Sequence, residues 1–338
     1  MHRQLVTIYS VIHFVVDFAC AALIARLEFL HVSSLFVAVV FYNFFAFFMQ
    51  WPLGIIADRL NKNALVAASG CAIVAGAFCF SAQPLAACVV AGIGNALFHL
   101  GGGIDVLNIS GKKATLPGIF VSTGALGLFL GASMAKQVPG VLVMLLISIF
   151  LLLWLHTKTQ GKISNLPMIC PTFSLVQLLI ITGLVLTVCL RSYVGFLTAF
   201  SWKTGAWLPL IAVCAVVAGK ILGGLIGDKA GFIRTAAVSL AVAAIGFIFA
   251  FQNVWAGVIT LICFNMTMPL TLTALTNLMP NNKGMAFGLL TAALFVGAWP
   301  VFYGYDYFAS PYGLLLLTVV SAALLLPALW GYKKEEVK

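Results

Sequence analysis

Charged side chains are scarce in this 338-residue chain. Asp, Glu, Lys and Arg make up 8% of it, hydrophobic residues make up 63%, and the mean hydropathy is +1.13. No soluble core of this length is so apolar, whereas about 20 apolar residues suffice for one membrane-spanning helix. Twelve such helices use roughly 240 residues, which leaves short loops and no room for a soluble domain. Because a backbone in lipid must be helical or form a closed barrel, and the apolar runs do not alternate, they predict helices.

Several common functional motifs are absent. The eight cysteines form neither a C-x-x-C pair nor a metal-ligand spacing, so they are interpreted as small core residues. No phosphate-binding loop ending in Gly-Lys-Ser or Gly-Lys-Thr occurs, so ATP is not the expected energy source. The first apolar run lacks a small-residue cleavage site and predicts a retained helix rather than a signal peptide. We therefore expect no cofactor and no bound metal.

The net charge of +10 is distributed as in a membrane protein. If both termini are cytoplasmic, most of the basic side chains lie on the cytoplasmic side and only Arg26, Lys136 and Lys203 lie in outer loops. This asymmetry follows the positive-inside rule. It predicts an even number of helices in the plasma or inner membrane, cytoplasmic termini, and no nucleic-acid partner. The basic side chains placed on the cytoplasmic side are Arg3, Arg59, Lys62, Lys112, Lys113, Lys158, Lys162, Lys229, Arg234, Lys283, Lys333, Lys334 and Lys338.

The apolar runs and the turn residues between them predict twelve spanning helices in an all-α polytopic membrane protein. Their expected ranges are 5–26, 34–57, 63–82, 85–108, 116–134, 139–157, 172–199, 206–228, 232–251, 254–277, 284–304 and 311–331. These ranges give an amino-terminal six-helix bundle (1–157), a short cytoplasmic linker (158–171), a carboxy-terminal six-helix bundle (172–331) and a cytoplasmic tail (332–338).

A short charged turn occurs twice, half a chain apart. Gly54 and Asp58 recur as Gly224 and Asp228 at one shared offset in the numbering, and each Asp is followed by a basic residue. The same offset pairs Asn95 with Asn265, Lys113 with Lys283, Gly118 with Gly288, and Gly127 with Gly297. Six matches at one offset indicate an internal duplication, and they predict two pseudo-symmetric bundles.

The repeated turn resembles the loop motif G-x-x-x-D-[RK]-x-G-[RK]-[RK] of the major facilitator superfamily of secondary transporters. The first copy has Asn61 where the motif has its second Gly, and Asn also tolerates a left-handed backbone. The second copy keeps that Gly as Gly231. The resemblance implies two six-helix bundles that rock around a central site, with the loop residues acting as a gate. That gating set is Gly54, Asp58, Arg59, Gly224, Asp228 and Lys229.

Glycines cluster in the fifth and eleventh predicted helices. Small residues allow close helix contact, so these positions predict either ordinary packing or flexing faces. Many antiporters of the superfamily carry a Gly-Pro pair in the fifth helix, and this chain lacks it. The glycines are Gly118, Gly124, Gly127, Gly131, Gly284, Gly288 and Gly297.

Ionisable residues inside the apolar runs are the candidate site residues. Asp17 lies near the middle of the first predicted helix, with His13 four residues earlier on the same face. His99 and Asp105 lie in the fourth helix, and Arg191 lies in the seventh. A charge at the bilayer centre costs about 3 kcal/mol on insertion scales, so each needs a partner or a water-filled cavity.

Several of these candidates also have a structural interpretation. A histidine such as His99 can pack against a backbone carbonyl, and Asp105 can be a solvated charge near a helix end. Lys220 can extend its amine toward the cytoplasm. Asn95 and Asn265 can bridge neighbouring helices. The sequence leaves these alternatives open.

Two further patterns support a central site. In the superfamily, helices 1, 4, 7 and 10 line the cavity, and the candidates lie on the first, fourth and seventh helices. The tenth carries Asn265 and several threonines around Pro269. His13-x-x-x-Asp17, Phe98-His99 before glycines, and Leu190-Arg191-Ser192 resemble the fosmidomycin-resistance branch, which exports small molecules against the proton gradient. Leu100 replaces a proline that often follows the helix 4 histidine in that branch.

The predicted function is secondary active transport, not an enzymatic reaction. We expect a monomer in the lipid bilayer that moves a small anionic or zwitterionic organic solute by proton-coupled efflux. Asp17 would exchange a proton, His13 or His99 would tune it, and Arg191 would hold the anionic group of the substrate.

Three alternatives remain. The first is proton-coupled uptake of a small metabolite. The second is an intramembrane aspartyl protease, but Tyr305-Asp306 lies near an outer loop and Gly102-Gly103-Ile104-Asp105 has Ile where that chemistry needs Gly. The third is a transporter-like sensor with no flux.

Overall fold

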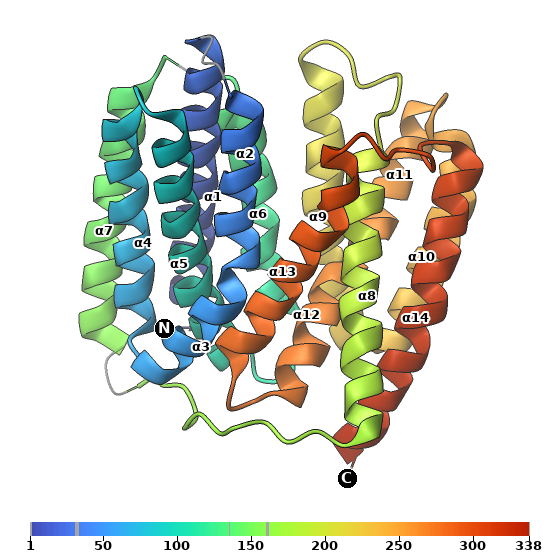
Figure 1. The fold of residues 1–338 in the computed structure, drawn as a ribbon. Helices are drawn as coiled ribbons and strands as arrows, with labels where there is room; N and C mark the ends of the chain where they lie inside the picture. Colours follow the sequence, from blue (N-terminus) through green and yellow to red (C-terminus); the bar gives the residue numbers. More distant parts are fainter. Residues whose placement is uncertain (1, 31–33, 135, 160–161, 338) are drawn as a thin grey trace. The chain divides into compact units, whose positions relative to one another are not determined.

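The computed structural model describes residues 2–30, 34–134, 136–159 and 162–337, and no strand occurs among them. The α-helices are α1 (His2–Phe29), α2 (Leu35–Asn43), α3 (Gln50–Leu60), α4 (Asn63–Ala77), α5 (Pro84–Ser110), α6 (Thr115–Gly131), α7 (Val138–Thr159), α8 (Leu175–Leu197), α9 (Trp207–Ala230), α10 (Phe232–Ala250), α11 (Val254–Asn265), α12 (Thr267–Leu278), α13 (Lys283–Phe302) and α14 (Pro311–Val337) (Figure 1). Eleven described helical spans are long and apolar enough to cross a membrane, and α6 is a shorter apolar helix. The predicted all-helical fold is confirmed.

Two predicted spans are interrupted. The second span consists of α2, a π-helical turn (Phe44–Phe48) and α3. The tenth span divides into α11 and α12 at Met266. Pro269 has no backbone N–H to give to the carbonyl of Asn265 four residues earlier, so the helical ladder is broken there. A short 3-10 turn (Phe78–Phe80) extends α4.

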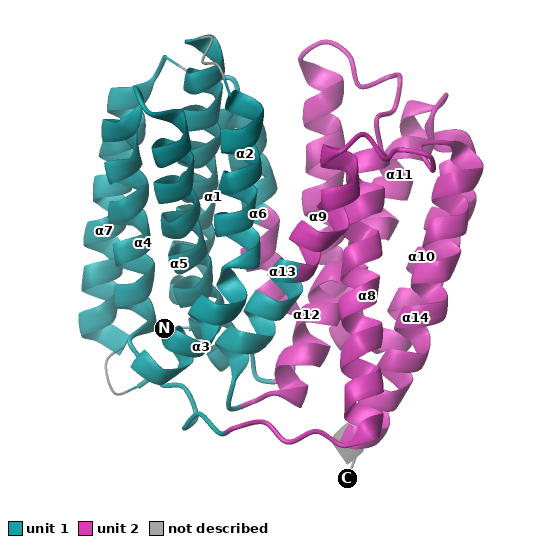
Figure 2. Ribbon diagram, in the orientation of Figure 1, with its two compact units in different colours: residues 1–111, 123–169, 281–292 teal, residues 112–122, 170–280, 293–338 magenta. Residues whose placement is uncertain are grey.

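The chain forms two compact units (Figure 2). Unit 1 contains residues 1–111, 123–169 and 281–292, and unit 2 contains residues 112–122, 170–280 and 293–338. The units follow the two predicted halves except at two segments. The first part of α6 belongs to unit 2, and the first part of α13 belongs to unit 1. α14 continues to Val337, so the predicted tail is largely helical.

Small residues allow close helix packing inside each unit. In unit 1, a Cβ on Gly70 of α4 would lie 2.4 Å from the backbone nitrogen of Phe98 in α5. In unit 2, a Cβ on Gly223 of α9 would lie 2.1 Å from the carbonyl oxygen of Met266. Only glycine permits such approaches, so backbone packing fixes these helix pairs.

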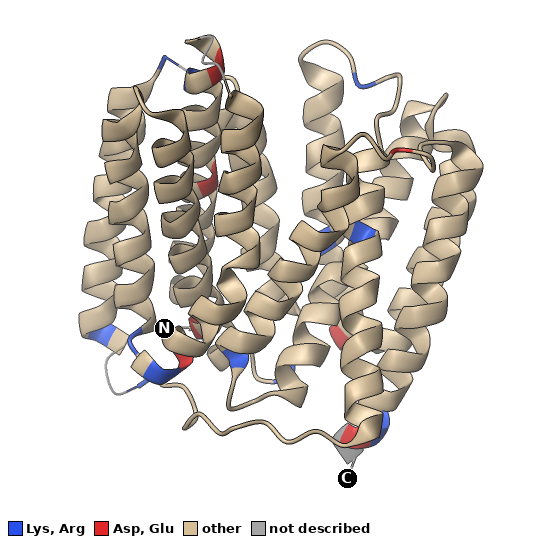
Figure 3. Cartoon of the chain, viewed as in Figure 1, with Lys and Arg blue, Asp and Glu red and all other residues tan. Residues whose placement is uncertain are grey.

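Apolar side chains cover the outer helices. On α7, Phe150 is 73% exposed, and Val143, Leu146 and Ile147 are exposed beside it. A soluble protein rarely exposes such a patch, whereas a lipid-facing helix does. Figure 3 shows Lys, Arg, Asp and Glu mainly near helix ends, with long uncharged stretches between them.

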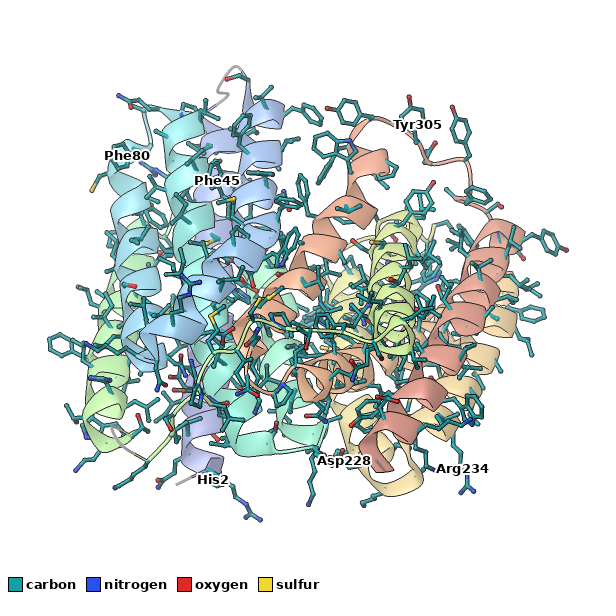
Figure 4. The ribbon with its side chains drawn as sticks, turned by 60° about the horizontal axis from the view of Figure 1, so that its bottom comes forward. His2, Phe45, Phe80, Asp228, Arg234 and Tyr305 are labelled. Atoms are coloured by element: carbon teal, nitrogen blue, oxygen red, sulfur yellow. The ribbon has the colours of Figure 1, made fainter. Side chains whose placement is uncertain are left out.

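Each unit has two distinct ends. In unit 1, His2 and Phe80 lie at opposite ends (Figure 4). In unit 2, Asp228 and Arg234 lie at the end opposite Tyr305 (Figure 4).

The segment that follows α7 is tied to unit 1, and we call residues 162–169 the linker strap. The Asn165 backbone N–H donates to Asn61 Oδ1 at 2.7 Å, and the amide nitrogens of Asn63 and Asn108 donate to Asn165 Oδ1 at 2.8 and 2.9 Å. Asn282 Nδ2 donates to the carbonyl of Ile169 at 2.9 Å. A segment predicted as a plain linker is therefore fixed at several points.

Candidate functional site

A buried cluster of polar side chains lies inside unit 1, and α1 supplies two of its members. His13 and Asp17 are one helical turn apart, so their side chains share a face. His13 Nε2 lies 3.3 Å from Asp17 Oδ2. His13 is 4% exposed and Asp17 is 7% exposed. Asp17 is thus the buried acid that the sequence predicted, and His13 is its immediate neighbour.

α5 completes the cluster with His99 and Asn95, which are also one turn apart. Asn95 Nδ2 donates to Asp17 Oδ1 at 2.8 Å and to Cys20 Sγ at 3.7 Å. His99 Nε2 lies 2.8 Å from His13 Nε2 and 3.8 Å from Asp17 Oδ1. Asn95 therefore bridges α5 to α1, as its structural interpretation predicted, and it also positions the carboxylate.

The histidine geometry fixes where a proton can reside. His99 Nδ1 lies 2.8 Å from the carbonyl oxygen of Asn95. A carbonyl oxygen only accepts, so His99 Nδ1 donates and Nε2 points at His13. The short contact between the two Nε2 atoms requires a proton on one of them. With neutral imidazoles the cluster carries the negative charge of Asp17, and one added proton neutralises it.

α6 closes the cluster from a third side. A Cβ on Gly124 would lie 2.2 Å from Asp17 Oδ2 and 2.4 Å from His13 Nε2. The carboxylate and the imidazole thus occupy the space that any larger side chain would need. The glycine cluster of the fifth predicted helix therefore has a specific role here, since Gly124 makes room for the site.

The cluster also has a donor set suited to a cation. His13, Asp17 and His99 each offer one ligand atom, and these atoms lie within 4.8 Å of one another. Two imidazoles and one carboxylate form a set that divalent transition metals accept. No metal site was predicted from the sequence. Because this donor set suits a metal ion, divalent cations should be included among the solutes when transport is tested.

Arg191 belongs to unit 2, where α8 carries it. Its residue is 9% exposed, and its Nη1 atom is buried without a hydrogen-bond partner. Across the described residues, the Arg191 side chain has no hydrogen bond and no carboxylate partner. A buried guanidinium with an unsatisfied donor is energetically unfavourable unless an anion binds it.

Two other predicted site residues have local partners in unit 2. Lys220 Nζ donates to the carbonyl of Val121 in α6 at 3.0 Å. Asn265 Nδ2 donates to the carbonyl of Leu261 at 2.9 Å, one turn earlier on α11. Lys220 thus binds the amino-terminal half of α6, whereas its structural interpretation had the amine extending toward the cytoplasm. Asn265 stabilises the end of α11.

Asp105 is a buried, fully engaged carboxylate, so its interpretation as a solvated end charge is wrong. It is 3% exposed. Tyr9 donates its hydroxyl to Asp105 Oδ2 at 2.7 Å, and Asn63 Nδ2 donates to Asp105 Oδ1 at 2.8 Å. Neither partner was predicted from the sequence. Tyr9 lies one turn before His13 on α1, and that spacing was the available signal.

The two repeated turns bind helix starts in the same way. In unit 1, Asp58 accepts the backbone N–H groups of Gly284 and Met285 at 2.8 and 2.9 Å. In unit 2, Asp228 accepts those of Ala114 and Thr115 at 2.7 and 3.0 Å. A carboxylate at a helix N-terminus satisfies free N–H groups and the helix dipole.

These contacts reproduce the sequence repeat. The offset that separates Asp58 from Asp228 also separates Ala114 from Gly284, and Thr115 from Met285. Gly54 and Gly224 let the paired backbones approach, since a Cβ on either would lie within 2.5 Å of a carbonyl oxygen. The repeat found in the sequence therefore relates each aspartate and also the backbone groups that it binds.

The basic residues of the repeated turns have smaller roles in this structure. Arg59 Nε lies 3.4 Å from Met168 Sδ in the linker strap. Lys229 is exposed and makes no contact with another described polar group. Asn61 adopts the left-handed backbone that its place in the motif predicted, with φ 49°.

The residues of the protease alternative do not form the required pair of helical aspartates. Asp306 lies in the exposed turn between α13 and α14, outside both helices. Asp105 is held by Tyr9 and Asn63.

Comparisons with known proteins define the fold. No protein-family model and no curated protein matches the sequence. Among solved structures, a variant of the Escherichia coli fucose:proton symporter is similar at 11% identity and TM-score 0.67, over 96% of this chain and 98% of that one. A bacterial homologue of the iron transporter ferroportin is similar at 13% identity and TM-score 0.62, over 99% and 100%. The human organic anion transporter TETRAN is similar at 13% identity and TM-score 0.65, over 98% and 99%.

These matches cover nearly the whole length of each chain. The fold is therefore that of the major facilitator superfamily, and the chain is a multi-pass helical membrane protein. At such low identity the likeness defines the fold alone. The resemblance to the fosmidomycin-resistance branch stays a prediction.

Proposed function

We propose that the protein is a secondary transporter that moves a small anionic or zwitterionic organic solute in exchange for protons. The observation that carries this proposal is the buried cluster of Asp17, His13 and His99. Burying a carboxylate and two imidazoles inside membrane helices is costly, so their presence there points to a functional site. Histidine titrates near physiological pH, so the cluster suits reversible proton binding.

Asp17 and the imidazole pair bind the transported proton together. Asn95 holds one carboxylate oxygen at 2.8 Å, and His13 lies 3.3 Å from the other. A proton entering the cluster removes its net charge, which lowers the penalty for burying it. The proton-loaded and proton-free clusters therefore favour different surroundings, and such a difference is what coupling needs.

Arg191 binds the anionic group of the solute. Its buried Nη1 has no partner among the described residues, so an incoming carboxylate, phosphate or phosphonate would satisfy it. A guanidinium binds such groups through two parallel hydrogen bonds. Lys220 and Asn265 already have backbone partners and play supporting parts.

Asp58 and Asp228 act as paired latches on helix starts. Each holds two backbone N–H groups of a helix that begins in the other half of the sequence. Movement of one half against the other, as alternating access requires, would break and remake these bonds. We place the latches and both termini on the cytoplasmic side of the cell membrane, and we expect a monomer.

The direction of transport defines the main alternative. Export follows from the resemblance to the fosmidomycin-resistance branch. The structural similarity to a fucose:proton symporter instead favours proton-coupled uptake of a small metabolite. A non-transporting sensor would bind its ligand without any flux.

Reconstitution into liposomes tests the proposal. With a pH gradient imposed, wild-type protein should move protons when solutes carrying a carboxylate, phosphate or phosphonate are supplied. Asp17→Asn should abolish the gradient-driven movement and retain solute exchange at equal pH. Full gradient-driven transport by Asp17→Asn would remove Asp17 from the coupling role.

Two further arms separate the alternatives. The sign of the proton flux distinguishes export from uptake. Manganese, iron(II), cobalt and zinc ions are tested as solutes because the cluster has a suitable donor set. Suppose that the wild type moves a metal ion without moving protons, and that His99→Ala abolishes this metal flux. The transported solute would then be a cation, and the proposal of an organic solute would be wrong.

A further inference from the structure

A groove with an unbalanced positive charge lies in unit 1, between the start of α1 and the end of α7. Its volume is about 210 Å³. Leu5, Ile8 and Leu155 form its apolar wall, and Trp154, Lys158 and Lys162 form its polar side. Leu5 and Leu155 are buried, whereas Trp154 and both lysines are exposed. The groove therefore joins an apolar slot to two accessible ammonium groups.

Among the described residues, no carboxylate pairs with these two lysines. None of the residues lining the groove is acidic. The buried carboxylate of Asp17 pairs with His13 and His99, far along α1 from the groove. The side chains of Lys158 and Lys162 have no hydrogen bond or ion pair there. Their charge is available to an outside anion.

The position of the groove fits the boundary between lipid tails and headgroups. It lies at the end of unit 1 where α1 begins, the end at which His2 lies in Figure 4. The exposed apolar stretch of α7 ends here with Trp154, one turn before Lys158. Tryptophan is enriched at membrane interfaces because its ring is apolar and its N–H is polar.

Unit 2 carries a related arrangement at the end of its last helix. Trp330 and Lys334 of α14 are one helical turn apart, as Trp154 and Lys158 are on α7. With Lys333 and Ile233 they line a groove of about 330 Å³. Here Lys334 Nζ already lies 3.4 Å from the centre of the Trp330 ring, and Glu335 follows it. The pattern recurs in both halves, but the lysines of unit 1 are the less engaged pair.

We propose that the groove of unit 1 is a binding site for one anionic phospholipid. Lys158 and Lys162 bind the phosphate of the headgroup, Trp154 lies beside the glycerol region, and an acyl chain follows Leu5, Ile8 and Leu155. Basic pockets between membrane helices recognise anionic headgroups in this way. The site lies in the inner leaflet under the positive-inside prediction. It does not depend on the transported solute.

The test measures lipid binding to the purified full-length protein in neutral detergent by native mass spectrometry. Dioleoyl phosphatidylglycerol is the probe, and dioleoyl phosphatidylcholine is the neutral comparison. The variant Lys158→Gln with Lys162→Gln should bind phosphatidylglycerol about 25-fold more weakly, since each lysine contributes about fivefold. Lys62→Gln with Lys113→Gln removes the same charge elsewhere and should bind as wild type does.

Further arms decide between lipid and other causes. Lys158→Arg with Lys162→Arg should retain binding, which also guards against a variant that fails to fold. Inorganic phosphate and glycerol phosphate should not compete at equal concentration, because they lack the acyl chain. Equal loss in the Lys62 and Lys113 control, equal binding of phosphatidylcholine, or full competition by inorganic phosphate would each overturn the proposal.

Discussion

Gly124→Ala is the most direct test of how α6 seats the buried cluster. The added Cβ would lie 2.2 Å from Asp17 Oδ2, and ordinary contact begins at 3.4 Å, so some group must move by about 1.2 Å. Overpacking of this kind costs about 1–3 kcal/mol. Alanine in place of glycine in a helix returns about 1 kcal/mol. The net change is a loss of up to about 2 kcal/mol, together with a displaced carboxylate.

A matched variant separates these two effects. Gly76 of α4 has nothing within 4 Å of the position that its Cβ would take. Gly76→Ala should therefore gain the stability that alanine adds to a helix, with no cost from overpacking. The two variants should therefore differ by about 1–3 kcal/mol. At about 2 °C per kcal/mol, thermal unfolding midpoints should differ by about 2–6 °C.

Transport provides the second readout for Gly124→Ala. Displacement of Asp17 or His13 changes the 3.3 Å contact on which proton binding depends. We expect the pH dependence of transport to shift in Gly124→Ala and to stay unchanged in Gly76→Ala. If Gly124→Ala were as stable as Gly76→Ala and kept the wild-type pH profile, the assigned role of Gly124 would be wrong.

Three further predictions address the remaining features. Arg191→Ala should lose the thermal stabilisation that anionic solutes give the wild type. Arg191→Lys should recover little of it, because lysine cannot bind two oxygens in a plane. If anionic solutes stabilised Arg191→Ala as much as the wild type, Arg191 would not be an anion site. Asp58→Asn and Asp228→Asn should each lower the unfolding midpoint, since each weakens charge-assisted bonds of about 1.5–3 kcal/mol. Asp228→Asn should lower it at least as much, because Asp228 also accepts the hydroxyl of Thr115. Lys229→Gln should change the midpoint little, and a smaller loss for Asp228→Asn than for Asp58→Asn would contradict the assigned contacts. Tyr9→Phe removes a hydrogen-bond donor from Asp105 and should lower the free energy of unfolding by about 1–3 kcal/mol. Tyr312→Phe is the control, because Tyr312 is 74% exposed and its substitution should change stability little. Equal unfolding midpoints for the two variants would show that the Tyr9 bond contributes nothing to stability.

Features that repeat or that follow a strong period could be predicted from the sequence. The constant offset between the two halves identified Asp58 and Asp228 before any contact was known, and it holds for their backbone partners as well. His13 and Asp17 were paired by helical spacing alone. Asn61 was expected to take a left-handed backbone, and it does so.

Features that arise from tertiary packing could not be read in this way. The π-helical turn at Phe44–Phe48 lies in a uniformly apolar run, where no residue type indicates a change of helix. Asp105 resembled a helix-end charge because its partners, Tyr9 and Asn63, come from two other helices. The contact of His99 with His13 likewise depends on how α5 packs against α1.

The linker strap has a consequence for the length of the connection between the halves. Contacts hold the chain as far as Ile169, and Ser174 caps the start of α8, so only residues 170–173 connect the two without such contacts. The five residue steps from Ile169 to Ser174 reach about 17 Å when extended. Extra residues inserted before Asn165 would form a loop upstream of the strap contacts and would leave the free connection to α8 unchanged in length. The same number of residues inserted after Cys170 would lengthen that connection. Insertions of equal size a few positions apart should therefore differ in the maximum distance they allow between the linker strap and α8.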